Sequence, residues 1–176
     1  MDLILWRHAE AEPGEPDLGR RLTAKGLRHA EQMGAWLEGH LPDAARILVS
    51  PAARAQQTAR ALNRRSRVVA EIGPGASVVA LLAAVGWPDS RVPVVVIGHQ
   101  PTLGGVASFL LCGEESSWAI KKASLWWLSN RLRDGGGGVA LRAAMGPDML
   151  CRSSRPGALP QRPSTAVRIA LEPRAS

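Results

Sequence analysis

Short apolar runs of strand length alternate with longer amphipathic segments of helix length through the first 150 residues. This alternation favours an α/β fold, because parallel strands must be joined by long crossover connections that are usually helices. The predicted strands are 2–7, 46–49, 67–70 and 93–97, and the predicted helices are 23–41, 50–63, 77–85 and 101–111. Segments 123–129 and 139–144, on either side of Asp134 and four glycines, predict an antiparallel hairpin at the sheet edge. We therefore expect three layers, α/β/α, around a mostly parallel central sheet with an antiparallel edge.

Two of the predicted helices begin with residues suited to a helix N-terminus. Thr23 can accept a hydrogen bond from an otherwise unpaired amide of the first turn, and an apolar stripe at helical spacing follows it. Ser50 is followed by Pro51, which fits a first turn because it lacks an N–H that would go unused. We therefore expect helices to start at these two points.

Residues 151–176 differ in composition from the rest of the chain. They hold five arginines against Glu172, so they carry +4 of the net charge of +7, and they show no sustained apolar period. We expect one domain over residues 1–150, followed by a flexible basic tail rich in Pro, Ser and Arg. A nucleic-acid binder acting through this tail is one alternative function, but the body of the chain carries only a small excess of positive charge, so we expect no nucleic-acid partner.

The tryptophans near the end of the domain could also suggest base stacking. Trp126 and Trp127 are neighbours in a predicted strand, so their side chains must point to opposite faces of the sheet. At most one of them can belong to any single stacking platform. We interpret both as core residues of an edge strand.

No apolar run approaches the roughly 18 residues of a membrane helix, so no membrane partner is expected. The N-terminus does not resemble a signal peptide, because Asp2 stands where a basic region would be and the apolar run that follows is short. These features predict a cytoplasmic protein. Cys112 and Cys151 fit that compartment as two free thiols, and neither has metal-ligand spacing around it.

Three short stretches place cationic or titratable residues where a predicted parallel strand ends. Arg7 and His8 end the first strand, Ser50–Thr58 follows the second, and Gly98–Pro101 follows the fourth. Ligands of open α/β sheets bind at this edge. Two arginines and two histidines near helix starts suit a phosphoryl group, because guanidinium groups match its oxygens and neutral imidazole is a nucleophile near pH 7.

In combination, the three stretches resemble the signature of the histidine phosphatase superfamily. Arg7-His8-Ala9 matches its first motif, Ser50–Thr58 matches Ser-Pro-x-x-Arg-Ala-x-Gln-Thr, and Gly98–Pro101 matches Gly-His-x-Pro, in the family's order and at its distances. The short body, Ala9 and the segment 71–75 are most similar to the SixA-type phosphohistidine phosphatases. The resemblance spans about residues 1–150 and implies a phosphoglycerate mutase-like fold.

The resemblance also implies roles for single residues. His8 would be the nucleophile that forms a phosphohistidine intermediate. Arg7 and Arg54 would bind the phosphoryl oxygens, and His99 would donate a hydrogen bond to the developing charge. No metal or other cofactor is expected, because the sequence has no carboxylate cluster with the spacing of a Mg²⁺ site.

The proton donor to the leaving group is less clearly marked. Glu71 is the positional candidate, because it comes just after the third predicted strand, but it could equally be a solvated loop residue. Glu10 and Glu12, close behind His8, are candidates for the rim of the site, and an exposed charged loop explains them as well.

The expected function is a metal-independent phosphatase that acts on phosphohistidine of a protein. Few residues are available to build a lid, so the site should be open to a folded protein partner, and the enzyme is expected to be a monomer. The alternatives are a phosphomonoesterase acting on a small metabolite phosphate ester and a non-catalytic module that binds phosphoproteins.

Overall fold

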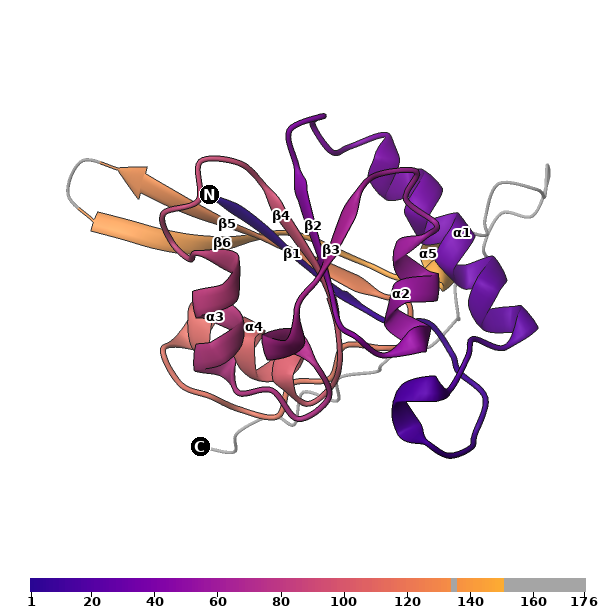
Figure 1. Cartoon of the computed structure of the whole chain (residues 1–176). Coiled ribbons are helices and arrows are strands. Elements are labelled where there is room, and N and C mark those ends of the chain that lie inside the picture. Colours follow the sequence, from indigo (N-terminus) through magenta and orange to yellow (C-terminus); the bar gives the residue numbers. More distant parts are fainter. Residues whose placement is uncertain (134–135, 151–176) are drawn as a thin grey trace, which may run out of the picture.

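The computed structural model describes residues 1–133 and 136–150 (Figure 1). The predicted tail, residues 151–176, lies outside the described residues. The described strands are β1 (Asp2–Arg7), β2 (Arg46–Val49), β3 (Ser66–Val68), β4 (Val94–Gly98), β5 (Leu125–Arg133) and β6 (Gly136–Met145). The described helices are α1 (Ala24–Glu38), α2 (Ala53–Ala59), α3 (Val78–Val85), α4 (Thr102–Cys112) and α5 (Pro147–Leu150), with the 3₁₀ turns η1 (Asp17–Gly19) and η2 (Ala70–Ile72).

The strands form one mixed sheet in the order β3-β2-β4-β1-β5-β6. The first four in this order run parallel, while β5 is antiparallel to β1 and β6 is antiparallel to β5. The predicted parallel sheet with an antiparallel hairpin at its edge is confirmed. The carboxyl ends of β1, β2 and β4 therefore lie at the same edge of the sheet.

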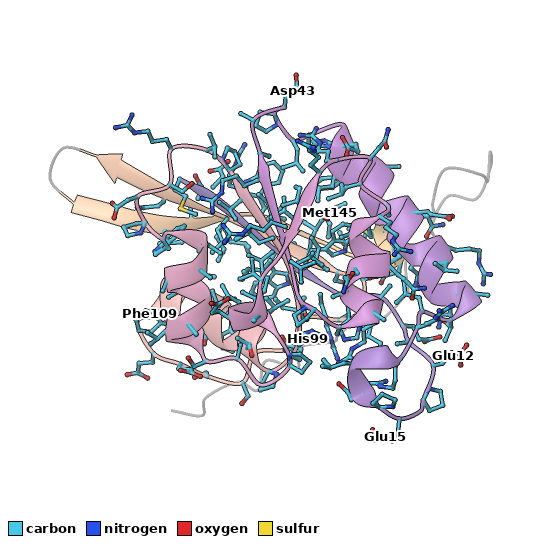
Figure 2. The ribbon with its side chains drawn as sticks, viewed as in Figure 1. Glu12, Glu15, Asp43, His99, Phe109 and Met145 are labelled. Carbon is cyan, nitrogen blue, oxygen red and sulfur yellow. The ribbon has the colours of Figure 1, made fainter. Side chains whose placement is uncertain are left out.

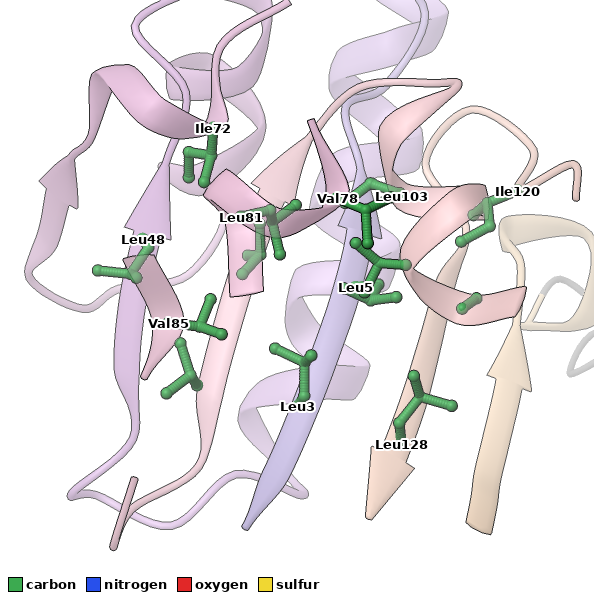
Figure 3. Close-up of a cluster of buried hydrophobic side chains, with 14 of the residues drawn as sticks. Leu3, Leu5, Leu48, Ile72, Val78, Leu81, Val85, Leu103, Ile120 and Leu128 are labelled. Carbon is green, nitrogen blue, oxygen red and sulfur yellow. The ribbon is translucent and has the colours of Figure 1, made fainter. Parts of the chain in front are cut away.

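Alternate residues of the central strands divide the core between the two faces of the sheet. Leu3 and Leu5 of β1 pack with α3 and α4 in one buried cluster (Figure 3), whereas Ile4 and Trp6 pack with α1 and α2 in another. Helices cover both faces (Figure 1), which gives the expected three layers. Trp126 packs against the first cluster and Trp127 belongs to the second, as predicted for neighbours in a strand.

The first predicted helix start is confirmed and the second is shifted. Thr23 Oγ1 accepts a hydrogen bond from Gly26 N at 2.8 Å, as expected for an N-cap. The helix predicted from Ser50 to residue 63 is shorter, because α2 spans Ala53–Ala59. Ser50 Oγ accepts from Ala52 N ahead of the helix and also contacts His99, so the cap prediction for Ser50 was wrong.

Other boundaries differ by a few residues from those expected. The third strand ends at Val68 because the chain turns into η2, and α1 ends at Glu38 with Gly39 as its C-cap. No helix among the described residues has the length and apolar character needed to cross a membrane.

Helix α1 approaches the turn that follows α2 closely at Gly34, and this predicts different effects on stability for two glycine substitutions in and after α1. A Cβ at Gly34 would lie 2.5 Å from the carbonyl oxygen of Ala61, so Gly34→Ala should lower the free energy of unfolding by about 1–3 kcal/mol. Gly39 has a φ of −70° and a nearest neighbour 3.6 Å from the added Cβ. Gly39→Ala should therefore leave stability unchanged or raise it by up to about 1 kcal/mol. Urea unfolding followed by circular dichroism checks both, and equal midpoints for the two variants would contradict this account.

Candidate active site

Four of the five predicted site residues come together at the carboxyl edge of the sheet. They line one pocket of about 350 Å³. Figure 2 places His99 at this edge, with Asp43 at the opposite end of the sheet. The pocket is lined by Arg7, His8, Ala11, Asp17, Arg20, Arg54, Pro74, His99, Gln100 and Lys122.

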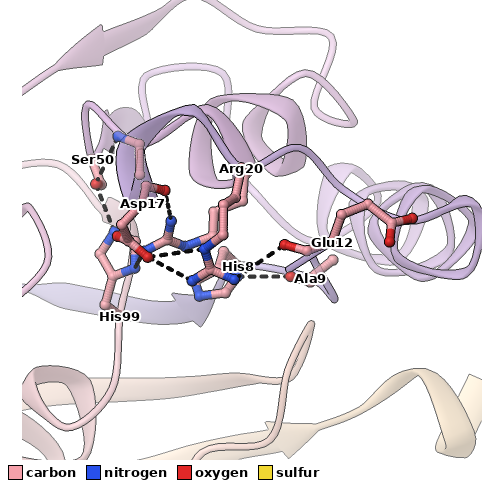
Figure 4. A network of polar contacts seen from close by, with 9 residues as sticks. His8, Ala9, Glu12, Asp17, Arg20, Ser50 and His99 are labelled. Carbon is pink, nitrogen blue, oxygen red and sulfur yellow. Dashed lines mark hydrogen bonds and ion pairs between the residues drawn. The ribbon is translucent and has the colours of Figure 1, made fainter. Parts of the chain in front are cut away.

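His8 is held with one ring nitrogen directed at a backbone carbonyl. Its Nδ1 lies 2.7 Å from Ala9 O (Figure 4). Its backbone N donates to Gly98 O at 3.1 Å. Because a carbonyl oxygen can only accept, the proton of the neutral ring resides on Nδ1. The lone pair is therefore on Nε2, which makes Nε2 the nucleophilic atom.

A buried hydroxyl connects the loop after β1 to α2. Thr58 Oγ1 accepts a hydrogen bond from Ala9 N at 3.0 Å and donates to Arg54 O at 2.8 Å. Thr58 is fully buried. Thr58 thus joins the first motif to the second, next to His8 of the first and Arg54 of the second.

The second histidine of the pocket packs against the first. The ring centroids of His8 and His99 are 5.0 Å apart. Nε2 of His99 lies 2.7 Å from Ser50 Oγ, and its Nδ1 lies 3.5 Å from Nη2 of Arg54. A guanidinium group only donates, so Nδ1 accepts and Nε2–H donates to the Ser50 hydroxyl. Ser50 therefore orients His99.

Both rings are neutral near pH 7. Burial, followed by the charges of Arg54 and Arg7, lowers the pKa of His8 to about 4. Burial and the neighbouring His8 lower the pKa of His99 to about 3. A neutral His8 has an available lone pair at physiological pH, as a nucleophile requires.

The two predicted phosphate-binding arginines are held by backbone oxygens. Arg7 Nη1 donates to Ile120 O at 2.8 Å, and Arg54 Nη1 donates to Asp17 O at 2.7 Å. The Nε atoms of both arginines are buried and have no hydrogen-bond partner within the described part of the chain. Buried donors without partners are costly, so an anion bound between the two guanidinium groups would stabilise them.

Sequence reasoning missed Asp17 and Arg20, which the loop after β1 brings into the pocket (Figure 4). The Asp17 carboxylate accepts from Arg20 Nη2 at 2.7 Å and from Arg54 Nη2 at 2.9 Å. Hydrogen bonds from Arg20, and then from Arg54, lower the pKa of Asp17. The available signal was an acidic and a basic residue three positions apart in a polar loop directly behind His8.

The predicted carboxylate candidates lie elsewhere. Glu71 is exposed in η2 and is not among the residues that line the pocket. The segment after η2 contributes Pro74 to the lining. Glu10 accepts from Thr23 Oγ1 and pairs with Lys25 at the start of α1. Glu12 is exposed, and its carbonyl oxygen accepts from Arg20.

Among residues 1–133 and 136–150, no cluster of three or more His, Cys, Asp or Glu side chains could hold a metal ion. Within the same residues, the pocket is built from cations and neutral imidazoles around a single carboxylate. Such a lining suits an oxyanion.

Comparison with known proteins agrees with this chemistry. A family model for the histidine phosphatase superfamily, branch 1, matches residues 3–75. The phosphohistidine phosphatase SixA homolog of Haemophilus influenzae is 31% identical over 151 residues, which cover 74% of this chain and 91% of that protein. The chain belongs to the histidine phosphatase superfamily. Phosphohistidine phosphatase SixA of Escherichia coli is 30% identical to this histidine phosphatase over 123 residues. The match covers 65% of this chain and 76% of the Escherichia coli protein.

A solved structure of the protein histidine phosphatase SixA complexed with tungstate is also similar to this histidine phosphatase. It has a TM-score of 0.72 and 26% identity, and the match covers 85% of this chain and 99% of that one. The predicted phosphoglycerate mutase-like fold and the SixA-type resemblance are confirmed.

The neutral histidines predict that stability falls as the pH is lowered from about 7 towards 4. Unfolded imidazole takes up a proton near pH 6.5, whereas folded His8 and His99 do so only near pH 4 and 3. Between these values the unfolded chain binds more protons, so the free energy of unfolding decreases with falling pH. Urea unfolding at pH 7, 6 and 5 measures this slope. His8→Asn should make the slope shallower, and equal slopes for wild type and variant would contradict the assignment.

Proposed function

We propose that this phosphatase hydrolyses phosphohistidine on a protein by way of a phosphohistidine intermediate on His8. The observation that carries the proposal is the state of the carboxylate in the pocket. Asp17 is the one carboxylate among the described residues that line the pocket, and its ion pairs with Arg20 and Arg54 keep it ionised. An ionised, paired Asp17 is a poor proton donor, so the site favours a substrate whose leaving group departs without a dedicated acid.

Leaving-group chemistry separates the two substrate classes. A phosphorylated imidazole can take a proton from solvent on its second ring nitrogen and then departs as neutral imidazole, whose conjugate acid has a pKa of about 6.5. The alkoxide released from a phosphate monoester is far more basic and needs a positioned acid. The exposed position of Glu71 outside the pocket makes it a weak candidate for that acid. A P–N bond to a histidine side chain is therefore the favoured target.

In the first step, Nε2 of His8 attacks phosphorus while its Nδ1–H stays hydrogen-bonded to Ala9 O. The substrate ring carries a proton from solvent on its second nitrogen, so the electron pair of the breaking P–N bond leaves with neutral imidazole as the P–Nε2 bond forms. Arg7 and Arg54 bind the phosphoryl oxygens with the donors that they have available, as phosphoryl transfer mainly requires positioning and charge stabilisation. Water then attacks the phosphorus of phosphorylated His8, and the P–Nε2 bond breaks. This step releases inorganic phosphate and regenerates the neutral imidazole of His8.

His99 supports the transfer from the other side of the pocket. The Ser50 hydroxyl can either accept from or donate to Nε2 of His99, since a hydroxyl does both. When a phosphoryl oxygen approaches Nδ1, the other tautomer can therefore form by proton exchange with water: Nε2 loses its proton and accepts from Ser50, and Nδ1 gains one and donates to the oxygen. Such donors to developing charge typically contribute about 10²-fold or more to the rate.

Loss of the nucleophile is the first test of this proposal. His8→Ala should abolish turnover of phosphoramidate, a small P–N donor, while the circular dichroism spectrum stays that of the folded protein. Wild type incubated with radioactive phosphoramidate should carry label that is labile in acid and stable in base. Label on serine, or label that persists in His8→Ala, would overturn the assignment.

Arg54→Ala should lower kcat/KM on phosphoramidate by on the order of 10²-fold, because it removes a preorganised donor. Arg46→Ala is a matched control, since Arg46 is exposed at the start of β2, away from the site edge. Equal losses in the two variants would show that general charge, and not position, accounts for the effect.

Substrate class is tested by comparing a histidine-phosphorylated protein with a panel of metabolite monoesters, using wild type and Glu71→Gln. The phosphohistidine protein should have the higher kcat/KM, and Glu71→Gln should leave that value unchanged because the side chain is exposed outside the pocket. A monoester that is hydrolysed faster, and whose hydrolysis depends strongly on Glu71, would support the metabolite phosphatase instead.

A further inference from the structure

A second hollow lies directly beside the phosphoryl pocket and takes no part in the proposed chemistry. Its volume is about 240 Å³, and it lies between η1 and the outer side of α2. The two hollows are adjacent at η1, because Asp17 lines the first and the next residue, Leu18, lines the second. In α2 likewise, Arg54 lines the first hollow and Gln57 and Arg60 line the second. The second hollow is therefore placed beside any peptide whose phosphorylated side chain occupies the first.

The second hollow has two cations without partners. Arg21 and Arg60 both line it, and neither side chain makes a hydrogen bond or ion pair within residues 1–133 and 136–150. In contrast, Arg20 and Arg54 are both paired with Asp17. No carboxylate is among the described residues that line this hollow. Its charge is therefore available to an anionic group from outside the chain.

The two glutamines of the hollow each make one hydrogen bond to a backbone group next to α2. Gln57 Oε1 accepts from Leu22 N at 2.7 Å, and Gln56 Nε2 donates to Pro51 O at 2.7 Å. Leu18 is 51% exposed and supplies an apolar surface next to the arginines. An occupant with an acidic side chain and an apolar neighbour would match this lining, since a guanidinium group binds a carboxylate through two parallel hydrogen bonds.

We propose that this second hollow is a recognition subsite for an acidic residue that lies a few positions from the phosphohistidine in the protein substrate. The inference rests on the proposed function, because it assigns a sequence preference to that same phosphoprotein. The chain's own residues 151–176 are unsuited to the hollow, since they carry a net charge of +4. The subsite binds a residue of the substrate near the phosphohistidine, whereas the first pocket binds only the phosphoryl group. Recognition then depends on the amino-acid sequence that flanks the phosphohistidine.

The test uses two synthetic phosphohistidine peptides that differ only at positions two to four residues away from the phosphohistidine. One peptide has Asp and Glu at these positions, and the other has Asn and Gln. Wild type should prefer the acidic peptide by roughly tenfold in kcat/KM, which corresponds to two partly exposed ion pairs. The double variant Arg21→Ala/Arg60→Ala should lose that preference through KM, and its kcat/KM on phosphoramidate should equal that of wild type.

The matched control is Arg46→Ala/Arg91→Ala, which removes the same charge from exposed positions at the amino ends of β2 and β4. This control should keep the preference. Equal rates for both peptides in wild type, or an equal loss in the control, would overturn the subsite. A loss of phosphoramidate turnover in Arg21→Ala/Arg60→Ala would also overturn it, because these arginines would then belong to the phosphoryl pocket.

Binding separates failure of the subsite from failure of the proposed function. The same two peptides, made with a non-hydrolysable phosphoryltriazole in place of phosphohistidine, are titrated into wild type and both double variants by fluorescence anisotropy. If neither phosphohistidine peptide is hydrolysed, the proposed function fails, while tighter binding of the acidic analogue to wild type and to the control would still support the subsite. Equal dissociation constants for the two analogues in wild type would refute it.

Discussion

Parallel pairing between the backbones of β1 and β4 is the interaction on which the site depends. The ladder ends at Arg7 and Gly98, and one further hydrogen bond joins His8 N to Gly98 O. The residues that follow the two strands, His8 and His99, are therefore neighbours although they are far apart in the sequence. A register shift of one residue would exchange the side chains of β1 between the two buried clusters, so the packing of this strand in the core also sets the position of the histidines.

Charge in the pocket follows from this convergence. Arg7, Arg20, Arg54 and Lys122 line a small space with one carboxylate, Asp17. In such surroundings burial and neighbouring cations both disfavour imidazolium, so the two histidines are uncharged. The same cations would attract a phosphoryl group, and together with burial, the larger cause, they keep the nucleophile neutral and available. The cations thus contribute both to affinity for the anion and to activation of the nucleophile.

The sequence predicted most of the fold and the strand-end residues of the site, because periodicity and capping are local properties. Strand β1 has the expected bounds, and Trp126 and Trp127 point to opposite faces as strand geometry requires. Asp17 escaped prediction because the direction of a side chain in an irregular loop depends on its tertiary partners, here Arg20 and Arg54. Glu71 follows β3 as expected, but the 3₁₀ turn η2 leaves it exposed, and no periodic pattern marks such a turn.

The hydroxyl of Thr58 has a consequence for motion in the site. It bonds the amide of Ala9 and the carbonyl of Arg54 at the same time, and it is fully buried. Thermal fluctuations that displace the loop carrying His8 therefore displace the start of α2 with it. This bonding fixes the loop of the nucleophile relative to Arg54, and η1 is held to the same arginine by two hydrogen bonds from the guanidinium to Asp17 O and Oδ2. The loop of the nucleophile, the start of α2 and η1 are thus connected as one unit around the place of the reacting group.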